Sequence, residues 1–126
     1  MYFHHIKLEA FCHATEDLGK VKEAMLNFLP EEFKDRDLES EELEGTFKNP
    51  ITVLRIHFEK QQEIKAVVEY LKANIDLEGF APSEHIIDRT YFWMRFDKQK
   101  AVNGELILGE KDAIQFKGKF AAFPAK

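Results

Sequence analysis

The segment from Cys12 to Asp17 gathers residue types that could do chemistry. Within six positions, "CHATED" holds a thiol, an imidazole, a hydroxyl and two carboxylates. A cysteine beside a histidine could act as nucleophile and base, and neighbouring carboxylates could act as general acid and base. The elements that position these side chains decide whether such chemistry is available.

Alternating polarity before this segment predicts a strand that runs through His13. One side of the strand carries Ile6, Leu8, Ala10 and Cys12, and the other side carries His5, Lys7, Glu9, Phe11 and His13. Cys12 and His13 therefore point to opposite faces and cannot pair as nucleophile and base. We interpret Cys12 as a buried small hydrophobe.

An amphipathic helix is predicted next, because Leu18, Val21, Met25 and Phe28 recur at steps of three and four. Thr15 or Asp17 can cap this helix, and Pro30 closes it. Acids in a first turn oppose the helix dipole favourably, which is the ordinary explanation of Glu16 and Asp17. Direct contact of the cap residues with a ligand stays the alternative.

The rest of the chain predicts one more helix and further strands. A strand follows Asn49-Pro50 to Phe58, and apolar spacing predicts a helix from about Gln61 to Asn74. Residues 77–85 are expected to form a loop. Strands are predicted at 89–96, 103–109 and 112–123, with a polar hairpin connection at 97–104. The order is β-α-β-α-β-β-β.

These elements predict one α+β domain over residues 1–126. We expect a two-layer sandwich, with two main helices on one face of a mostly antiparallel sheet of about five strands. A chain of 126 residues and 14.8 kDa, 44% hydrophobic and with twelve phenylalanines, suits one folded globule.

Localisation is expected to be cytoplasmic. No apolar run reaches the roughly 18 to 20 residues that span a bilayer, and the N-terminal residues lack a secretory layout. The one cysteine cannot form an internal disulfide, which agrees with a reducing compartment.

The net charge of −5 is unevenly distributed. Residues 1–88 hold 10 lysines and arginines against 19 acids, a balance of −9, whereas residues 89–126 hold 8 against 4, a balance of +4. Such asymmetry indicates an anionic partner. Eight acids lie between Glu31 and Glu44. This acidic segment is either a solvated loop or a flap that screens non-specific binding.

Metal, cofactor and nucleotide sites lack their usual patterns. The five histidines form no metal-binding spacing with one another or with the cysteine, and the six glycines form no phosphate-binding loop. We therefore expect no metal, no cofactor and no catalytic residue, and a small hydrolase is the least favoured hypothesis.

One face of the predicted sheet interleaves aromatic rings with cations. The face opposite the helices is expected to present Phe11, Tyr91 and Trp93 among Lys7, His13, Arg55, His57, Arg95, Lys117 and Lys119. Such a surface suits stacking of unpaired bases and contacts to phosphates. Alternatively, these aromatics pack under a loop or a second subunit. The polar connection after the predicted strand at 89–96 adds hydrogen-bond donors to phosphate from Lys98, Gln99, Lys100 and Asn103.

Four local patterns go beyond generic alternation: "HATED" at His13 to Asp17, "NPI" at Asn49 to Ile51, "DKQ" at Asp97 to Gln99, and "GEL" at Gly104 to Leu106 followed by the terminal "PAK". In these patterns the chain resembles a small archaeal family of RNA-binding proteins that is also described as a predicted exosome subunit. The resemblance implies a fold like that of the large-subunit ribosomal protein that contacts 5S ribosomal RNA. It also implies RNA-facing roles for Thr15, Glu16, Asp17, Asp97, Lys98 and Gln99.

Our first hypothesis is an RNA-binding protein of archaeal RNA processing or ribosome function, with no catalysis of its own. Its RNA is expected to be ribosomal or another structured RNA. The predicted RNA-binding residues are Lys7, His13, Thr15, Arg55, Tyr91, Trp93, Arg95, Lys98, Gln99, Lys100, Lys117 and Lys119. The alternative is a protein-interaction subunit that docks on the exosome, RNase P or the ribosome.

Overall fold

The computed structural model describes residues 3–45, 49–75, 86–87, 91–109 and 113–120. Six strands form one antiparallel sheet in the order β2-β3-β1-β6-β5-β4. The strands are β1 (Phe3–His13), β2 (Glu39–Glu44), β3 (Pro50–Phe58), β4 (Ile86–Ile87), β5 (Tyr91–Asp97) and β6 (Ala113–Phe120). The helices are α1 (Leu18–Leu26), α2 (Gln61–Asn74) and α3 (Lys98–Val102), with a 3₁₀ turn, η1 (Glu31–Phe33).

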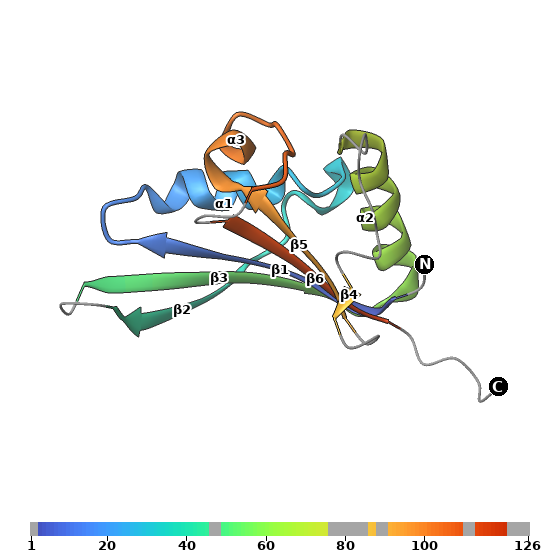
Figure 1. Ribbon diagram of the computed structural model, residues 1–126, viewed down its shortest axis with the longest axis horizontal. Coiled ribbons are helices and arrows are strands. Elements are labelled where there is room, and N and C mark those ends of the chain that lie inside the picture. Colours follow the sequence, from blue (N-terminus) through green and yellow to red (C-terminus); the bar gives the residue numbers. More distant parts are fainter. Residues whose placement is uncertain (1–2, 46–48, 76–85, 88–90, 110–112, 121–126) are drawn as a thin grey trace.

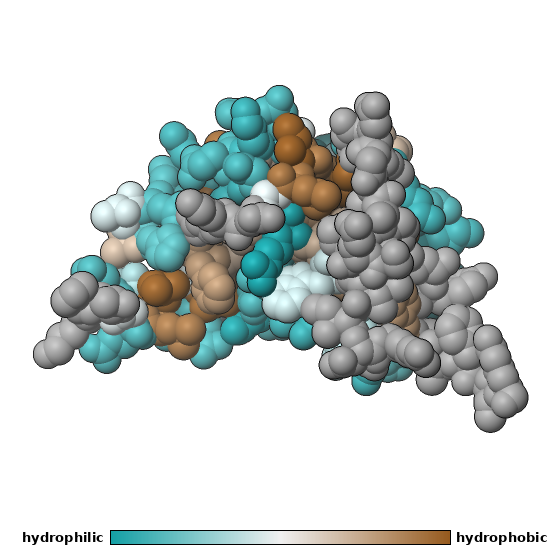
Figure 2. Space-filling model, viewed as in Figure 1, coloured by the Kyte–Doolittle hydropathy of each residue, from teal (hydrophilic) through white to brown (hydrophobic). Residues whose placement is uncertain are grey.

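The three helices lie on the same side of the sheet, α1 and α3 above one end and α2 above the other (Figure 1). No helix of the described residues covers the opposite side, which we call the open face. The predicted α+β sandwich with helices on one sheet face is therefore confirmed. The outer surface around α1 is mostly hydrophilic (Figure 2), as expected for an amphipathic helix that turns its apolar side to the sheet.

The core lies between the helices and the covered sheet face. Every second residue of the central strands is buried there: Ile6, Leu8, Ala10 and Cys12 on β1, Leu54, Ile56 and Phe58 on β3, Phe92, Met94 and Phe96 on β5, and Ile114 and Phe116 on β6. Val21, Met25, Ile64 and Val67 fill the space from the helices. Each of the leucine, isoleucine, valine, methionine and phenylalanine side chains contributes about 1.5–3 kcal/mol on burial. The predicted period of two thus fixes which residues face the open side.

Gly118 of β6 allows the ring of Phe3 on β1 to pack closely against the backbone of β6. A Cβ atom at this position would lie 2.5 Å from Phe3 Cδ1 and Cε1, which is too close for two carbon atoms that are not bonded. The Phe3 ring packs against Phe92 and Phe120, with centroids 6.0 and 5.3 Å away. The absence of a side chain on Gly118 therefore makes room for this aromatic cluster between β1, β5 and β6.

The acidic segment differs from its prediction in part. Residues 39–44 are not a solvated loop but the edge strand β2, which pairs with β3 from Glu39 opposite Arg55 to Glu44 opposite Pro50. Glutamates have weak strand propensity, but pairing with a neighbouring strand overrides it. All six residues of β2 are exposed.

The segment after β5 also differs from its prediction. Residues 98–102 form helix α3 and not a hairpin connection, because the Asp97 carboxylate accepts a hydrogen bond of 2.9 Å from Lys100 N–H and caps a helical turn. Gly104, at φ 83°, follows the helix in a conformation that favours glycine. Residues 103–109 form no strand, although Leu108 makes one isolated bridge with Phe96. The loop predicted at 77–85 lies outside the described residues.

No helix among the described residues is long and apolar enough to cross a membrane.

Candidate functional site

The strand register places cations and rings side by side on the open face. Trp93 of β5 lies opposite Lys117 of β6, Lys117 lies opposite Lys7 of β1, and Lys7 lies opposite His57 of β3. In the next row, Tyr91 lies opposite Lys119, which lies opposite His5. Directly opposed side chains on one face are about 5 Å apart at Cβ, close enough to interact.

Cations lie over the rings of β5. Lys117 Nζ is 4.5 Å from the Tyr91 ring centroid and 5.8 Å from that of Trp93. The Arg95 guanidinium carbon lies 4.8 Å from the Trp93 centroid. These distances are within the range of cation–π interactions, which attract each cation to the face of the ring. We call Lys7, Tyr91, Trp93, Arg95, Lys117 and Lys119 the basic-aromatic half of the open face.

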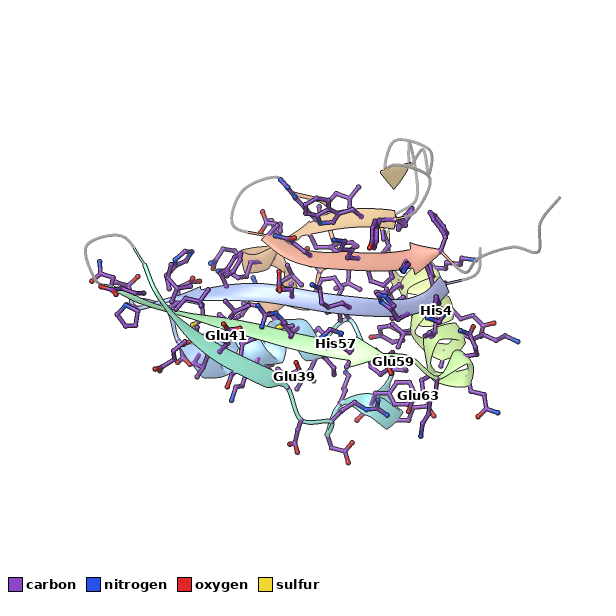
Figure 3. The ribbon with its side chains drawn as sticks, turned by 90° about the horizontal axis from the view of Figure 1, so that it is seen from below. His4, Glu39, Glu41, His57, Glu59 and Glu63 are labelled. Atoms are coloured by element: carbon purple, nitrogen blue, oxygen red, sulfur yellow. The ribbon has the colours of Figure 1, made fainter. Side chains whose placement is uncertain are left out.

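The other half of the open face is neutralised by carboxylates. Arg55 Nε donates to Glu9 Oε2 at 2.7 Å, and Arg55 Nη1 donates to Glu41 Oε2 at 2.9 Å. These hydrogen bonds to Glu41 and Glu9 raise the pKa of Arg55. Glu39 of β2 lies 3.7 Å from His57 Nε2. Figure 3 shows Glu39 and Glu41 beside His57 on this side of the sheet. Arg55 thus lies on the predicted face, but in a carboxylate-lined part of it.

His5 lies at the border of the basic-aromatic half. Its pKa is lowered, first by partial burial and then by the neighbouring charges of His4 and Lys119. An imidazole held neutral among cations gains a proton when an anion arrives beside it. The sequence analysis did not select His5 as a site residue. Only the pairing of β1 with β6 shows that His5 lies opposite Lys119.

Lys98 is placed inside the protein and not on a surface. Only 1% of the residue is exposed, and Nζ donates to Phe11 O and to Glu16 Oε1, each at 2.8 Å. The preceding residue, Asp97, caps α3. A side chain with these contacts is not available to a phosphate, so we leave Lys98 out of the RNA contacts that we propose below.

Gln99 and Lys100 are exposed on α3, which lies on the helical side of the sheet (Figure 1). The side-chain amide of Asn27 donates to Ala101 O at 2.8 Å and ties α3 to the end of α1. The structure therefore separates these two predicted contacts from the basic-aromatic half.

His13 and Thr15 line a shallow pocket at the end of β1, together with Ala14, Asn49, Pro50 and Ile51. The pocket has a volume of about 290 Å³. Asp17 caps α1 by accepting a hydrogen bond of 3.2 Å from Lys20 N–H, so the capping interpretation holds for Asp17. The "NPI" pattern is recognisable in the sequence, but only the fold brings Asn49 next to His13.

Three of the residues from Cys12 to Asp17 differ in role from a catalytic group, and Glu16 lies before α1 and not in its first turn, which holds no acid. Cys12 is 4% exposed in the core, whereas His13 is exposed on the other face, which confirms their predicted separation. Glu16 accepts hydrogen bonds from His13 N–H and from Lys98. The described residues contain no group of three or more histidine, cysteine, aspartate or glutamate side chains placed to hold a metal ion.

Comparison with known proteins identifies relatives along nearly the whole chain. A family model described as "RNA binding" matches residues 5–120. The chain is 39% identical to "RNA-binding protein PAB1135" from Pyrococcus abyssi, with 98% of this chain and 85% of that protein covered. It is 34% identical to the uncharacterised protein MJ0213 from Methanocaldococcus jannaschii, covering 86% and 78%.

Solved structures show the same fold. The crystal structure of AF2318 from Archaeoglobus superposes with a TM-score of 0.84 at 26% identity and covers 98% of this chain and 91% of that one. Mth689, a DUF54 protein from Methanothermobacter thermautotrophicus, gives a TM-score of 0.79 at 31% identity, covering 100% and 90%.

Proposed function

Because the chain belongs to the archaeal RNA-binding family whose model spans residues 5–120, we propose that it binds RNA through the basic-aromatic half of its open face. Lys7, Lys117, Lys119 and Arg95 neutralise phosphates in this proposal. Tyr91 and Trp93 pack against bases or sugars. The observation that carries it is the set of cation–π contacts from Lys117 and Arg95 to the two rings of β5.

The distribution of charge favours RNA binding at the basic-aromatic half over the carboxylate-lined part around Arg55. On β5 and β6, the open-face positions from Tyr91 to Arg95 and from Gln115 to Lys119 carry no carboxylate, whereas Glu9 and Glu41 bind Arg55 on β3. An RNA phosphate that approaches β3 meets cations that are already paired. The same phosphate over β6 meets Lys117 and Lys119, which lie opposite the rings of Trp93 and Tyr91. Among the described residues, Lys7 is the lysine of this half with a carboxylate beside it, Glu9 Oε2 at 3.8 Å. We infer that RNA crosses β1, β6 and β5.

Single-stranded or unpaired RNA fits this surface better than a continuous duplex. Bases can stack on aromatic side chains only when they are splayed out, and lysines along one strand suit a backbone that runs beside them. The unpaired regions of ribosomal or other structured RNA offer such segments. The proposed role is therefore binding within archaeal RNA processing or ribosome function, without catalysis by this chain.

The test is a titration of the full chain with a single-stranded RNA oligonucleotide, followed by fluorescence anisotropy at several salt concentrations. Lys117→Gln with Lys119→Gln should weaken binding and lower the salt slope, by about 0.7 for each phosphate that the variant no longer neutralises. Lys22→Gln with Lys65→Gln is the matched control, because it makes the same charge change on the exposed surface of α1 and α2. Equal effects of the two pairs, or binding that is indifferent to salt, would contradict the proposal.

The protein-docking alternative has its own readout. Association with the exosome, RNase P or the ribosome stays a prediction that native sedimentation with crosslinked-RNA sequencing can test. If the Lys117→Gln, Lys119→Gln double variant no longer binds RNA but still sediments with the exosome, RNase P or the ribosome, RNA binding and docking use different surfaces. If the complex dissociates while RNA binding persists, the open face is a protein interface and the proposal fails.

A further inference from the structure

The pocket between the β1–α1 turn and the start of β3 joins two parts of the chain that lie 34 or more residues apart. Its six lining residues are His13, Ala14, Thr15, Asn49, Pro50 and Ile51. We propose that this pocket holds the base of one unpaired RNA nucleotide and so gives the protein sequence preference. The inference rests on the proposed RNA binding and adds a second, separate contact to it.

The lining favours a neutral ligand group. None of the six residues is an acid, a lysine or an arginine, and the volume of about 290 Å³ lies at the small end of ligand pockets. A phosphate or a metal ion needs charged or multiple ionic partners, which this lining does not supply. Proline, isoleucine and alanine surfaces suit the flat faces of a base, and the imidazole of His13 can stack on it.

The polar groups of the lining suit the edge of a base. The Asn49 amide has both donors and acceptors, and the Thr15 hydroxyl can donate or accept. An asparagine amide can make two hydrogen bonds to one base edge, which discriminates between bases. Both residues are exposed, so their polar groups are accessible to a ligand.

The walls of the pocket are fixed before a ligand arrives. On one side, Glu16 Oε1 accepts from His13 N–H at 3.1 Å and from Lys98 Nζ at 2.8 Å, while Glu16 N–H donates to His13 O at 2.9 Å. On the other side, Gly45 N–H donates to Asn49 O at 2.8 Å. The two walls meet because His13 pairs with Ile51 across β1 and β3. A preformed pocket reduces the entropy cost of binding.

The pocket lies along β1 from the basic-aromatic half. His13 and Lys7 share the open face of this strand and are six residues apart, or about 20 Å at the usual rise per residue. One oligonucleotide can therefore reach both contacts, whereas a single nucleotide can occupy only one. This separation makes the two contacts distinguishable by experiment.

The first experiment uses the full ¹⁵N-labelled chain and the four nucleoside 5′-monophosphates, each titrated separately, with inorganic phosphate as the control. We expect amide shifts concentrated at residues 13–15, 49 and 51, with larger shifts for at least one nucleotide than for the others. The same shifts with inorganic phosphate would overturn the proposal, because the pocket would then be an anion site. Shifts confined to the lysines of β6 would also overturn it.

The second experiment compares Asn49→Ala with Ser40→Ala, a control that removes a polar group from an exposed position of β2. Anisotropy is measured with oligo(U), oligo(A) and oligo(C) of ten nucleotides. Asn49→Ala should weaken the preferred oligonucleotide about tenfold and leave the salt slope unchanged, because no phosphate contact is removed. Circular dichroism checks that the variant is folded.

The outcomes separate this inference from the proposed function. If the wild-type chain binds all oligonucleotides with a steep salt slope and Asn49→Ala changes none of them, RNA binding stands and the base pocket is wrong. If the wild-type chain shows no salt-dependent binding, the proposed function fails, and nucleotide shifts at the pocket then report a small-molecule site instead of an RNA contact.

Discussion

Lys98 Nζ lies 2.8 Å from Glu16 Oε1, a contact between residues 82 positions apart in the chain. The two residues belong to the "DKQ" and "HATED" patterns, and the same lysine also donates to Phe11 O. The contact fixes the β1–α1 turn against the start of α3. The "DKQ" and "HATED" patterns, which lie far apart in the sequence, are therefore joined by this contact in the folded protein.

Lys98→Met should reduce the free energy of unfolding by about 3 kcal/mol, because it removes one partner of a largely buried ion pair and leaves the carboxylate uncompensated. Urea denaturation measures this decrease. Lys100→Met is the matched control on the exposed surface of the same helix and should change stability by less than about 0.5 kcal/mol. Similar decreases for the two variants would show that the buried pair is not what stabilises the turn.

The same pair shows why local patterns do not predict burial of a charged residue. A lysine in a polar segment is expected to be exposed and able to bind a phosphate, since lysine is rarely fully buried without a partner. The partner, Glu16, is far away in the chain and by its position reads only as a first-turn acid. Local sequence holds no information about such a long-range pair, so the burial of Lys98 could not be predicted.

Period-two alternation, in contrast, was sufficient for the open face. It correctly separated Cys12 from His13, and apolar residues at steps of three and four separately predicted the helix from Gln61 to Asn74. It missed β2, because six residues with four glutamates lack an apolar pattern and become a strand only through pairing with β3. The acids of β2 lie beside two cations of the open face, Glu41 beside Arg55 and Glu39 beside His57. These pairs could not be predicted without the strand.

Trp93 is the only tryptophan, so its fluorescence reports on the basic-aromatic half. We expect single-stranded RNA to change this emission with the same midpoint as the anisotropy signal, because a base or sugar contacts the ring. Trp93→Ala should weaken RNA binding about tenfold and leave the salt slope unchanged, since the variant removes stacking but keeps every phosphate partner. Tripolyphosphate is the control ligand and should cause a smaller change. An emission spectrum unaltered at saturating RNA would rule out contact at Trp93.

His5 predicts a pH dependence of RNA binding. Its pKa lies below 6.5 in the free protein, because burial, His4 and Lys119 disfavour its charged form. A phosphate beside Lys119 favours the charged form, so binding takes up a proton and affinity should rise as the pH falls from 8 to 6. His5→Gln should reduce this rise, which RNA anisotropy at a series of pH values measures. A pH profile that is identical in wild type and His5→Gln would exclude this role.

The contact of Arg36 with Glu63 predicts a pH dependence of stability. Arg36 Nη1 donates to Glu63 Oε1 at 3.1 Å, and Nη2 donates to Oε2. The hydrogen bond from Arg36 lowers the pKa of Glu63 below 4.5 in the folded state. A lowered pKa contributes stability that is present above about pH 4.5 and disappears as the pH falls through the folded value.

Glu63→Gln should therefore cost about 1 kcal/mol at pH 7 and progressively less below pH 4.5. Denaturation at a series of pH values measures the difference from wild type. Glu69→Gln, an exposed change on the same helix, should show little difference at any pH. A cost for Glu63→Gln that does not shrink on acidification would show that the ion pair is not its source.

Glu41 predicts a gain in RNA affinity when it is changed. Its carboxylate accepts from Arg55 Nη1 at 2.9 Å, so Glu41→Gln leaves Arg55 with Glu9 alone and makes more of its charge available to a phosphate. We expect RNA to bind about two- to fivefold more tightly, with a steeper salt slope, because one more phosphate contact forms. Anisotropy with the same oligonucleotide measures both quantities.

Glu42→Gln separates this effect from a general decrease in negative charge. Glu42 is the next residue on β2, is also exposed, and points to the opposite side of the strand, so the change in net charge is the same. Removing one acid anywhere on a domain with a net charge of −5 raises affinity slightly by long-range attraction. Only Glu41→Gln also releases Arg55. Equal gains from the two variants would therefore mean that RNA stays on β1, β6 and β5 and does not reach β3.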